Sequence, residues 1–207
     1  MKKIEFGEIK NILDYEKIRQ SFRSKIINIK KDRRLKVGDK LTLTFENRHT
    51  VTFQIEEMIR VERIVDEKKI QEEIETYNEL IPNDDELSAT LFVEVDEQSQ
   101  IKPVLDSLVG LNRDSVYMQV GKRMVPAIFE EGHATNDRIS AVQYVRFKLL
   151  PEEAKAFADR SVPIRIVVKH KNYAAEANLP EEMRKTLHDD FAQGATANVW
   201  NYEVDFK

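Results

Sequence analysis

Cysteine is absent from this chain of 207 residues. Without it the chain cannot form disulfide bonds, thiolate nucleophiles, cysteine-bound iron–sulfur clusters or zinc sites built on cysteine. Histidine is scarce, and none of the four histidines pairs with another at the HxH, HxxH or HExxH spacing typical of zinc ligands. We therefore expect no cofactor, and a disulfide-free chain of this size fits the cytoplasm.

Long apolar runs and glycine-rich phosphate loops are also missing. No segment approaches the run of about 18 apolar residues that a membrane-spanning helix requires. No apolar run follows the lysines at the start of the chain, as it would in a signal peptide. The six glycines form neither GxGxxG nor a P-loop. The sequence predicts no membrane contact and no nucleotide site of these two kinds.

Charged residues are plentiful and unevenly placed. The net charge of -4 argues against a dedicated nucleic-acid binder, which usually has a basic excess. Residues 17–40 hold ten Lys and Arg against two Asp, whereas residues 56–97 hold fifteen Asp and Glu against four Lys and Arg. The densest basic part consists of Lys30, Lys31, Arg33 and Arg34. We expect this part to be a solvated face, to bind a complementary protein partner or, as the least favoured alternative, to bind nucleic acid.

The periodicity of apolar residues predicts alternating helices and strands. Helices are expected over residues 8–31, 66–81, 99–109, 151–159 and 179–191. Strands are expected over residues 36–46, 88–95, 115–120, 123–129, 141–150, 162–170 and 198–206. This pattern favours an α+β fold, with a mostly antiparallel sheet built from hairpins and helices packed on one face. We treat residues 1–207 as a single domain with a soft internal boundary near 82–87.

The segment 39–56 alternates between apolar and polar residues on both sides of Asn47-Arg48-His49. This alternation predicts a β-hairpin with its tip at 47–49, followed by a surface helix. On that helix Arg60 and Arg63 follow the junction with the hairpin. They either form local ion pairs or hold an anion.

Two further groups of residues are candidates for chemistry. Glu130 and His133 have the Glu-x-x-His spacing of di-iron sites on helices, although Gly132 and a preceding strand favour a solvated loop. His170 and Tyr173 lie at a predicted strand end and are the best acid–base candidates, because histidine titrates near neutral pH. The alternative interpretation of this second pair is a strand end with a packed tyrosine.

Three segments carry a resemblance to a known family. They are LTLTFENRHTVTFQIEEMIRVERI, IQEEIETYNELIP with ELSATLFVEV, and VVKHKNYAAEANLPEEMRKTLHDDF. With them the chain resembles, over nearly its whole length, the uncharacterised bacterial family catalogued as domain of unknown function 3501. The resemblance implies no activity. It implies a setting in peroxide defence or electron transfer, because family members are often encoded beside rubrerythrin and an iron–sulfur, heterodisulfide-reductase-like protein.

Two functional hypotheses follow. The first is an accessory or binding protein of a cytoplasmic redox or peroxide-stress system, which acts through a protein partner such as one of those two neighbours. The alternative is a metalloprotein or enzyme that uses Glu130, His133 and His170.

Overall fold

The structure is a computed structural model, and it describes residues 1–130 and 138–192. Its helical elements are η1 (Phe6–Glu8), α1 (Ile12–Lys31), α2 (Arg48–Glu62), α3 (Glu67–Asn78), η2 (Gln98–Gln100), α4 (Ile101–Ser107), α5 (Pro151–Ala156) and α6 (Glu181–Ala192). Its strands are β1 (Arg34–Val37), β2 (Leu41–Phe45), β3 (Glu86–Val93), β4 (Val116–Val120), β5 (Arg123–Pro126), β6 (Ile128–Phe129), β7 (Val142–Lys148), β8 (Ile164–His170) and β9 (Tyr173–Asn178). None of these helices combines the length and the apolar character that crossing a bilayer requires.

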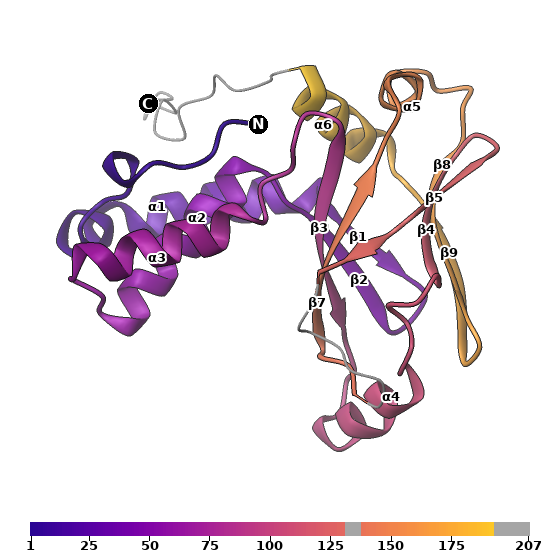
Figure 1. Cartoon of the computed structure of the whole chain (residues 1–207), viewed down its shortest axis with the longest axis horizontal. Helices are drawn as coiled ribbons and strands as arrows, with labels where there is room; N and C mark the ends of the chain where they lie inside the picture. The colour runs from indigo at the N-terminus through magenta and orange to yellow at the C-terminus, as the bar shows by residue number, and fades with distance from the viewer. Residues whose placement is uncertain (131–137, 193–207) are drawn as a thin grey trace.

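The strands of the described residues form two antiparallel sheets, in the orders β1-β2-β3-β7-β6 and β5-β4-β8-β9. The two sheets pack on each other across the largest apolar core, which includes Leu43, Leu91, Met118 and Ile166. Strand β3 lies between β2 and β7, and its first six residues are buried. The predicted strand over 88–95 is therefore a covered, central strand of its sheet. We call the two packed sheets the sandwich, seen at the right of Figure 1.

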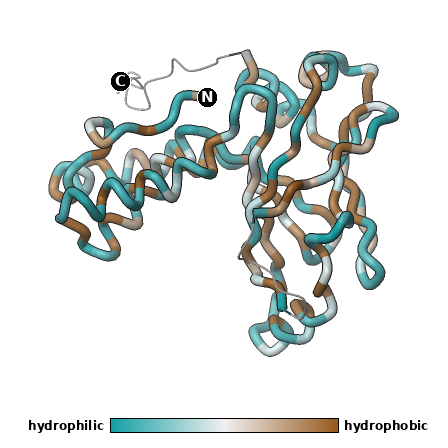
Figure 2. Tube along the Cα trace, in the orientation of Figure 1, coloured by the Kyte–Doolittle hydropathy of each residue, from teal (hydrophilic) through white to brown (hydrophobic). Residues whose placement is uncertain are grey.

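Helices α1, α2 and α3 form a bundle that projects from the five-stranded sheet, at the left of Figure 1, and we call it the helical arm. Its apolar contacts are made by Val51, Ile55 and Ile59 of α2, Ile74 of α3, and Tyr15, Phe22 and Ile26 of α1. The start of the chain is tied to α3, because Ile4 and Asn78 exchange two hydrogen bonds of 2.8 and 2.9 Å. Figure 2 shows apolar and hydrophilic residues alternating along both the arm and the strands.

The predicted hairpin over residues 39–56 is wrong in its second half. Strand β2 forms as expected, but it pairs with β1 and β3. Asn47, the expected start of the loop, is instead the N-cap of α2, and its side chain accepts a hydrogen bond from the Thr50 amide. The chain therefore passes from strand to helix at the point where a turn was predicted.

The wrong assignment has a simple physical origin. Val51 and Ile55 are two strand periods apart, but they are also one helical turn apart, and Ile59 continues the helical series. All three are buried on α2, whereas Phe53, which a strand would have buried with them, is only half-buried. Short apolar runs of this kind fit both periods.

The α+β class and the antiparallel pairing are confirmed, although two sheets form. The predicted strands over 115–120 and 123–129 pair as the hairpin of β4 and β5, which turns at Gly121, a residue with a positive φ of 58°. The sequence patterns merged β1 and β2, the two halves of a tight hairpin, into one predicted strand over 36–46, and they missed β9, the second half of the hairpin with β8. The predicted C-terminal strand over residues 198–206 lies outside the described residues and stays a prediction.

Candidate functional site

The angle between the helical arm and the outer face of the five-stranded sheet contains a pocket of about 350 Å³, which we call the elbow pocket. Its lining residues are Lys30, Arg34, Thr44, Glu46, Gln54, Thr90, Phe92, Glu94, Val142 and Tyr144. They come from the end of α1, from α2 and from four strands or strand ends of the sheet, so the pocket lies at the joint between arm and sandwich (Figure 1). Its volume is typical of sites for small ligands.

Glu46 forms the floor of the elbow pocket. Its side chain is 3% exposed. The carboxylate accepts hydrogen bonds from Thr90 Oγ1 at 2.6 Å, from Gln54 Nε2 at 3.1 Å and from the Thr50 hydroxyl. All three donors are uncharged, so a buried acid is held at the floor by polar groups alone.

The junction of β2 and α2 explains why Glu46 lies there. The Glu46 amide donates to Ser88 O at 2.8 Å and extends the pairing of β2 with β3 by one residue. Asn47 then caps α2 in a reciprocal arrangement with Thr50, with two hydrogen bonds of 3.0 Å. Because the strand becomes a helix without a loop, the side chain between them is enclosed by both elements.

A row of polar residues crosses the sheet beneath the pocket. Arg34 lies opposite Thr44, Thr44 opposite Thr90, and Thr90 opposite Tyr144, so the row spans β1, β2, β3 and β7. Burial raises the pKa of Tyr144, and the negative charges of Glu46 and Glu130 raise it further. The outer face of this sheet is therefore polar although much of it is covered.

The rim of the elbow pocket carries charges of both signs. Arg34 forms an ion pair with Glu94, and Glu94 also accepts a hydrogen bond of 2.7 Å from Thr42. Lys30, at the end of α1, places its ammonium group 5.9 Å from the ring centre of Phe53. The pocket thus combines a buried acid at the floor, a neutralised pair and one further cation.

Two other pockets in the described part of the chain have fewer directed groups. One of about 400 Å³ lies between α5 and α6, but its Arg184 donates to the carbonyl oxygens of Val162, Ala156 and Asp159 and so holds the chain together. The other, of about 860 Å³, lies between the turn of β1 and β2 and helix α4. It is lined mainly by surface side chains.

The predicted acid–base pair, His170 and Tyr173, lies at the turn between β8 and β9. His170 is buried; its Nε2 lies 3.1 Å from Val109 O, and its Nδ1 accepts from the Asn172 amide at 3.3 Å. The Tyr173 hydroxyl donates to Val37 O at 2.7 Å and accepts from the Lys40 amide at 3.1 Å. Both side chains therefore connect β9 and its turn to neighbouring backbone.

Of the two predicted metal ligands, Glu130 and His133, the structure describes only Glu130. Glu130 follows β6 and is exposed, whereas His133 lies outside the described residues. Within residues 1–130 and 138–192, no three His, Asp or Glu side chains are grouped closely enough to hold a metal ion.

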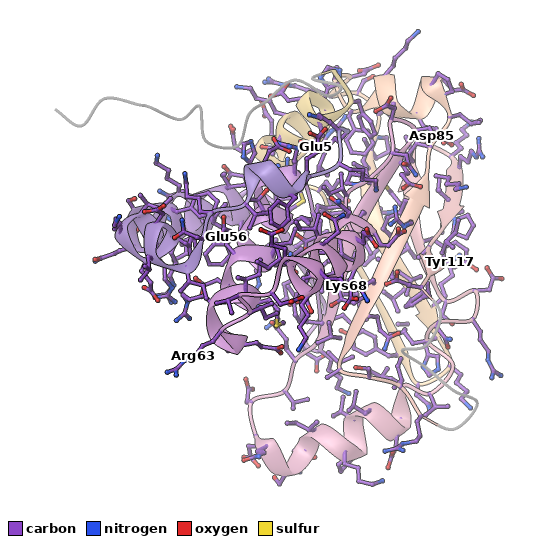
Figure 3. The ribbon with its side chains drawn as sticks, turned by 60° about the vertical axis from the view of Figure 1, so that its left-hand side comes forward. Glu5, Glu56, Arg63, Lys68, Asp85 and Tyr117 are labelled. Carbon is purple, nitrogen blue, oxygen red and sulfur yellow. The ribbon has the colours of Figure 1, made fainter. Side chains whose placement is uncertain are left out.

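The two predicted anion-binding arginines are used differently. Arg60 forms ion pairs with Glu57 at 3.2 Å and with Glu16 at 3.6 Å, so it joins α2 to α1. Arg63 is the C-cap of α2, with a positive φ of 53°, and Figure 3 shows its side chain pointing away from the arm. The structure therefore does not direct both guanidinium groups at one point.

The predicted basic cluster is split by burial. Lys31 is exposed, Lys30 and Arg34 lie on the rim of the elbow pocket, and Arg33 is 1% exposed. Arg33 donates to both carboxylate oxygens of Asp190 on α6, at 2.6 and 2.7 Å. Its guanidinium thus connects the base of the arm to α6 and is not available on the surface.

Adjacent acids on α2 have opposite environments. Glu56 is buried and accepts one hydrogen bond from the Lys10 amide at 2.8 Å, and burial raises its pKa to about 7. Figure 3 shows it between the helices of the arm. Glu57 accepts from Arg19, Tyr15 and Arg60, and these bonds outweigh its desolvation and lower its pKa to about 2.

Sequence reasoning did not single out Glu46, Thr90 or Tyr144. One signal was present, because the strands LTLTFE and SATLF place threonines between apolar residues. Such alternation usually means a solvated face. The structure covers part of that face with the arm, which turns ordinary strand threonines into buried hydrogen-bond donors.

These features define a class of protein in which an antiparallel sandwich carries a projecting helical arm, with a polar pocket at the joint. The chain matches the family described as "Protein of unknown function (DUF3501)" over residues 3–191, and it belongs to that family.

One solved structure is similar over almost the whole chain. It is the crystal structure of a novel protein of unknown function from Burkholderia pseudomallei, with a TM-score of 0.84 and 30% sequence identity. The match covers 91% of this chain and 99% of that one. A comparison with curated proteins finds no match. The fold is therefore shared by a relative, and neither similarity brings an activity with it.

Proposed function

We propose that the protein is an accessory or binding protein of a cytoplasmic redox or peroxide-stress system, and that it acts through a protein partner. The observation that carries the proposal is the outer face of α1. Arg23, Ile27 and Lys31 are four residues apart on this helix, so they share one face, which we call the α1 stripe. All three are exposed, and Ile27 retains 49% of its surface.

The composition of the α1 stripe fits a protein partner. An apolar side chain flanked by two cations suits a surface on which an apolar residue is bordered by carboxylates. The arm projects from the sandwich (Figure 1), and the three side chains of the stripe are exposed on it. The redox setting is supported only by the family resemblance, which makes rubrerythrin and the iron–sulfur, heterodisulfide-reductase-like protein the first partners to test.

The environments of the candidate catalytic and anion-binding side chains favour a binding protein over an enzyme. His170 and Tyr173 use their polar atoms to hold neighbouring backbone. Arg60 is engaged by two carboxylates.

The experiment is a titration of each partner with the purified protein at about 50 mM and about 300 mM salt. We expect binding that weakens at the higher salt concentration. Reversing Arg23 and Lys31 together to Glu should weaken it by at least about tenfold while leaving the melting temperature nearly unchanged, because exposed charges contribute little to folding.

The matched control is the double reversal of Lys122 and Lys171 to Glu. Both residues are exposed in turns of the four-stranded sheet, so the change in net charge is the same at a distant place. A third variant, Ile27→Ser, tests the apolar part of the stripe. Failure of both partners to bind at low salt, or equal weakening by the control, would refute the proposal.

A further inference from the structure

We propose that the elbow pocket binds a small zwitterion, an amino acid or a dipeptide, with its ammonium group at Glu46 and its carboxylate at Lys30. This site is separate from the α1 stripe, and the inference does not depend on the proposed protein partner. It rests on the position, burial and hydrogen bonds of the pocket residues.

Glu46 provides the position for a cationic group. An ionised carboxylate offers about four acceptor positions, and the three hydrogen bonds from Thr50, Gln54 and Thr90 leave one of them for a ligand. A buried charge is stabilised far more by a cation than by neutral donors. An ammonium group that enters the pocket would provide the missing positive charge at its floor.

Lys30 provides the position for an anionic group. The other basic side chain of the pocket, Arg34, is already paired with Glu94, and Glu94 is held further by Thr42. The ammonium of Lys30 instead lies over the ring of Phe53 beside the pocket. It can therefore reach a ligand carboxylate without breaking an ion pair of the described residues.

The walls of the pocket fit the body of such a ligand. Phe92, Val142 and Tyr144 line it from β3 and β7, and all three are half-buried. Apolar walls with a few directed polar groups are the usual composition of a small-molecule site. An ammonium group within about 6 Å of the face of either aromatic ring, Phe92 or Tyr144, would be attracted to it.

Ligands that carry charge of only one sign fit the pocket less well. A metal cation would find one acid, Glu46, because Glu94 is neutralised by Arg34. A simple anion would be attracted by Lys30 but repelled by the acid below it. A molecule with both charges satisfies both ends of the pocket at once.

The first test changes the ligand and leaves the protein intact. Glycyl-leucine, its N-acetyl form and its C-terminal amide are titrated separately into the full-length protein by calorimetry. The acetyl group removes the ammonium charge, and the amide removes the carboxylate charge. We expect glycyl-leucine to bind and each modified form to bind at least about tenfold more weakly.

The second test assigns each charge to its residue. In Glu46→Gln the advantage of glycyl-leucine over the N-acetyl form should disappear, and in Lys30→Gln its advantage over the amide should disappear. Lys148→Gln, an exposed change at the end of β7, is the matched control and should bind as the unmodified protein does. If Glu46→Gln does not fold, the ligand series and the Lys30→Gln variant still test whether the pocket binds a zwitterion.

Three results would overturn the inference. The first is that glycyl-leucine fails to bind at about 10 mM. The second is that all three compounds bind equally. The third is that both variants lower the melting temperature and leave binding unchanged, which would mean that Lys30 serves only as the counter-ion of Glu46.

Discussion

The sandwich and the helical arm are stabilised in different ways. The sandwich has one continuous apolar core between its sheets, in which Leu43, Phe45 and Phe147 are completely buried. The arm has two smaller apolar clusters and, between its helices, a buried acid and a network of charged groups. The comparison teaches that the stability of the sandwich should depend on packing, whereas that of the arm should depend on protonation.

The largest expected effect is a packing defect in the sandwich. Phe45→Ala removes a fully buried ring whose centre lies 6.5 Å from that of Phe147. The lost burial and the remaining cavity should lower the free energy of unfolding by about 4 kcal/mol. Chemical denaturation measures the change, and Phe6→Ala, at a residue 41% exposed on η1, is the control. A loss below 1 kcal/mol would contradict a continuous core.

The next effect is expected where the arm meets the sandwich. Arg33→Ala leaves the carboxylate of Asp190, which is only 11% exposed, without its ion-pair partner, and this should cost about 3 kcal/mol. Burial already raises the pKa of Asp190 against the opposing influence of Arg33, so removing Arg33 should raise that pKa further and make the loss of stability depend on pH. Denaturation at several pH values measures both, and an unchanged stability would show that the ion pair does not hold the joint.

A smaller effect distinguishes the arm by its dependence on pH. The pKa of Glu56 is about 7 in the folded arm and near 4.5 in the unfolded chain, so the folded state binds the extra proton between these values. Its contribution to stability is complete below pH 4.5 and is lost as the pH rises through 7. Glu56→Gln should therefore gain about 2 to 3 kcal/mol relative to the unmodified protein between pH 4.5 and pH 8.

The difference in stability between Glu56→Gln and the unmodified protein separates the titration of Glu56 from the other titrations. His49, whose pKa burial lowers to about 4, titrates in both. Glu57, with a pKa of about 2, loses its stabilising contribution only as the pH falls below about 4.5. A pH-independent difference would show that Glu56 is not buried as described.

A still smaller effect is expected at the turn of β8 and β9. Tyr173→Phe removes the hydrogen bonds to Val37 and Lys40 and should cost about 1 to 2 kcal/mol. If partner binding remains unchanged in the same variant, the hydroxyl acts only on stability. Loss of partner binding without loss of stability would restore Tyr173 as a functional residue.

The smallest expected effect is that of removing metal. We expect that dialysis against a chelator leaves the melting temperature within experimental error, and that protein purified without a tag contains no stoichiometric metal. Thermal denaturation checks the first expectation, and elemental analysis checks the second. Near-stoichiometric iron, zinc or manganese that disappears in His133→Ala or His170→Ala would instead support the metalloprotein alternative.

Local patterns predicted the elements that depend on local chemistry. The helices predicted over 66–81 and 151–159 begin at the cap Asp66 and at Pro151, and the turn at Gly121 lies between the strands predicted over 115–120 and 123–129. The elbow pocket could not be predicted in this way, because it assembles residues from Lys30 to Tyr144 on six elements. The direction of the arm also decides whether Thr90 is solvated or buried, and that direction is set by a junction that was predicted as a turn.

The shortness of the joint has a mechanical consequence. Two residues connect α1 to β1, and two connect β2 to α2, so the arm has little slack relative to the sheet. A helix of 15 residues such as α2 is about 22 Å long. A rotation of about 10° at Asn47 would therefore move its far end by about 4 Å. The arm would rotate about a point beside the elbow pocket, and a small molecule bound in that pocket would determine the position of the far end of the arm.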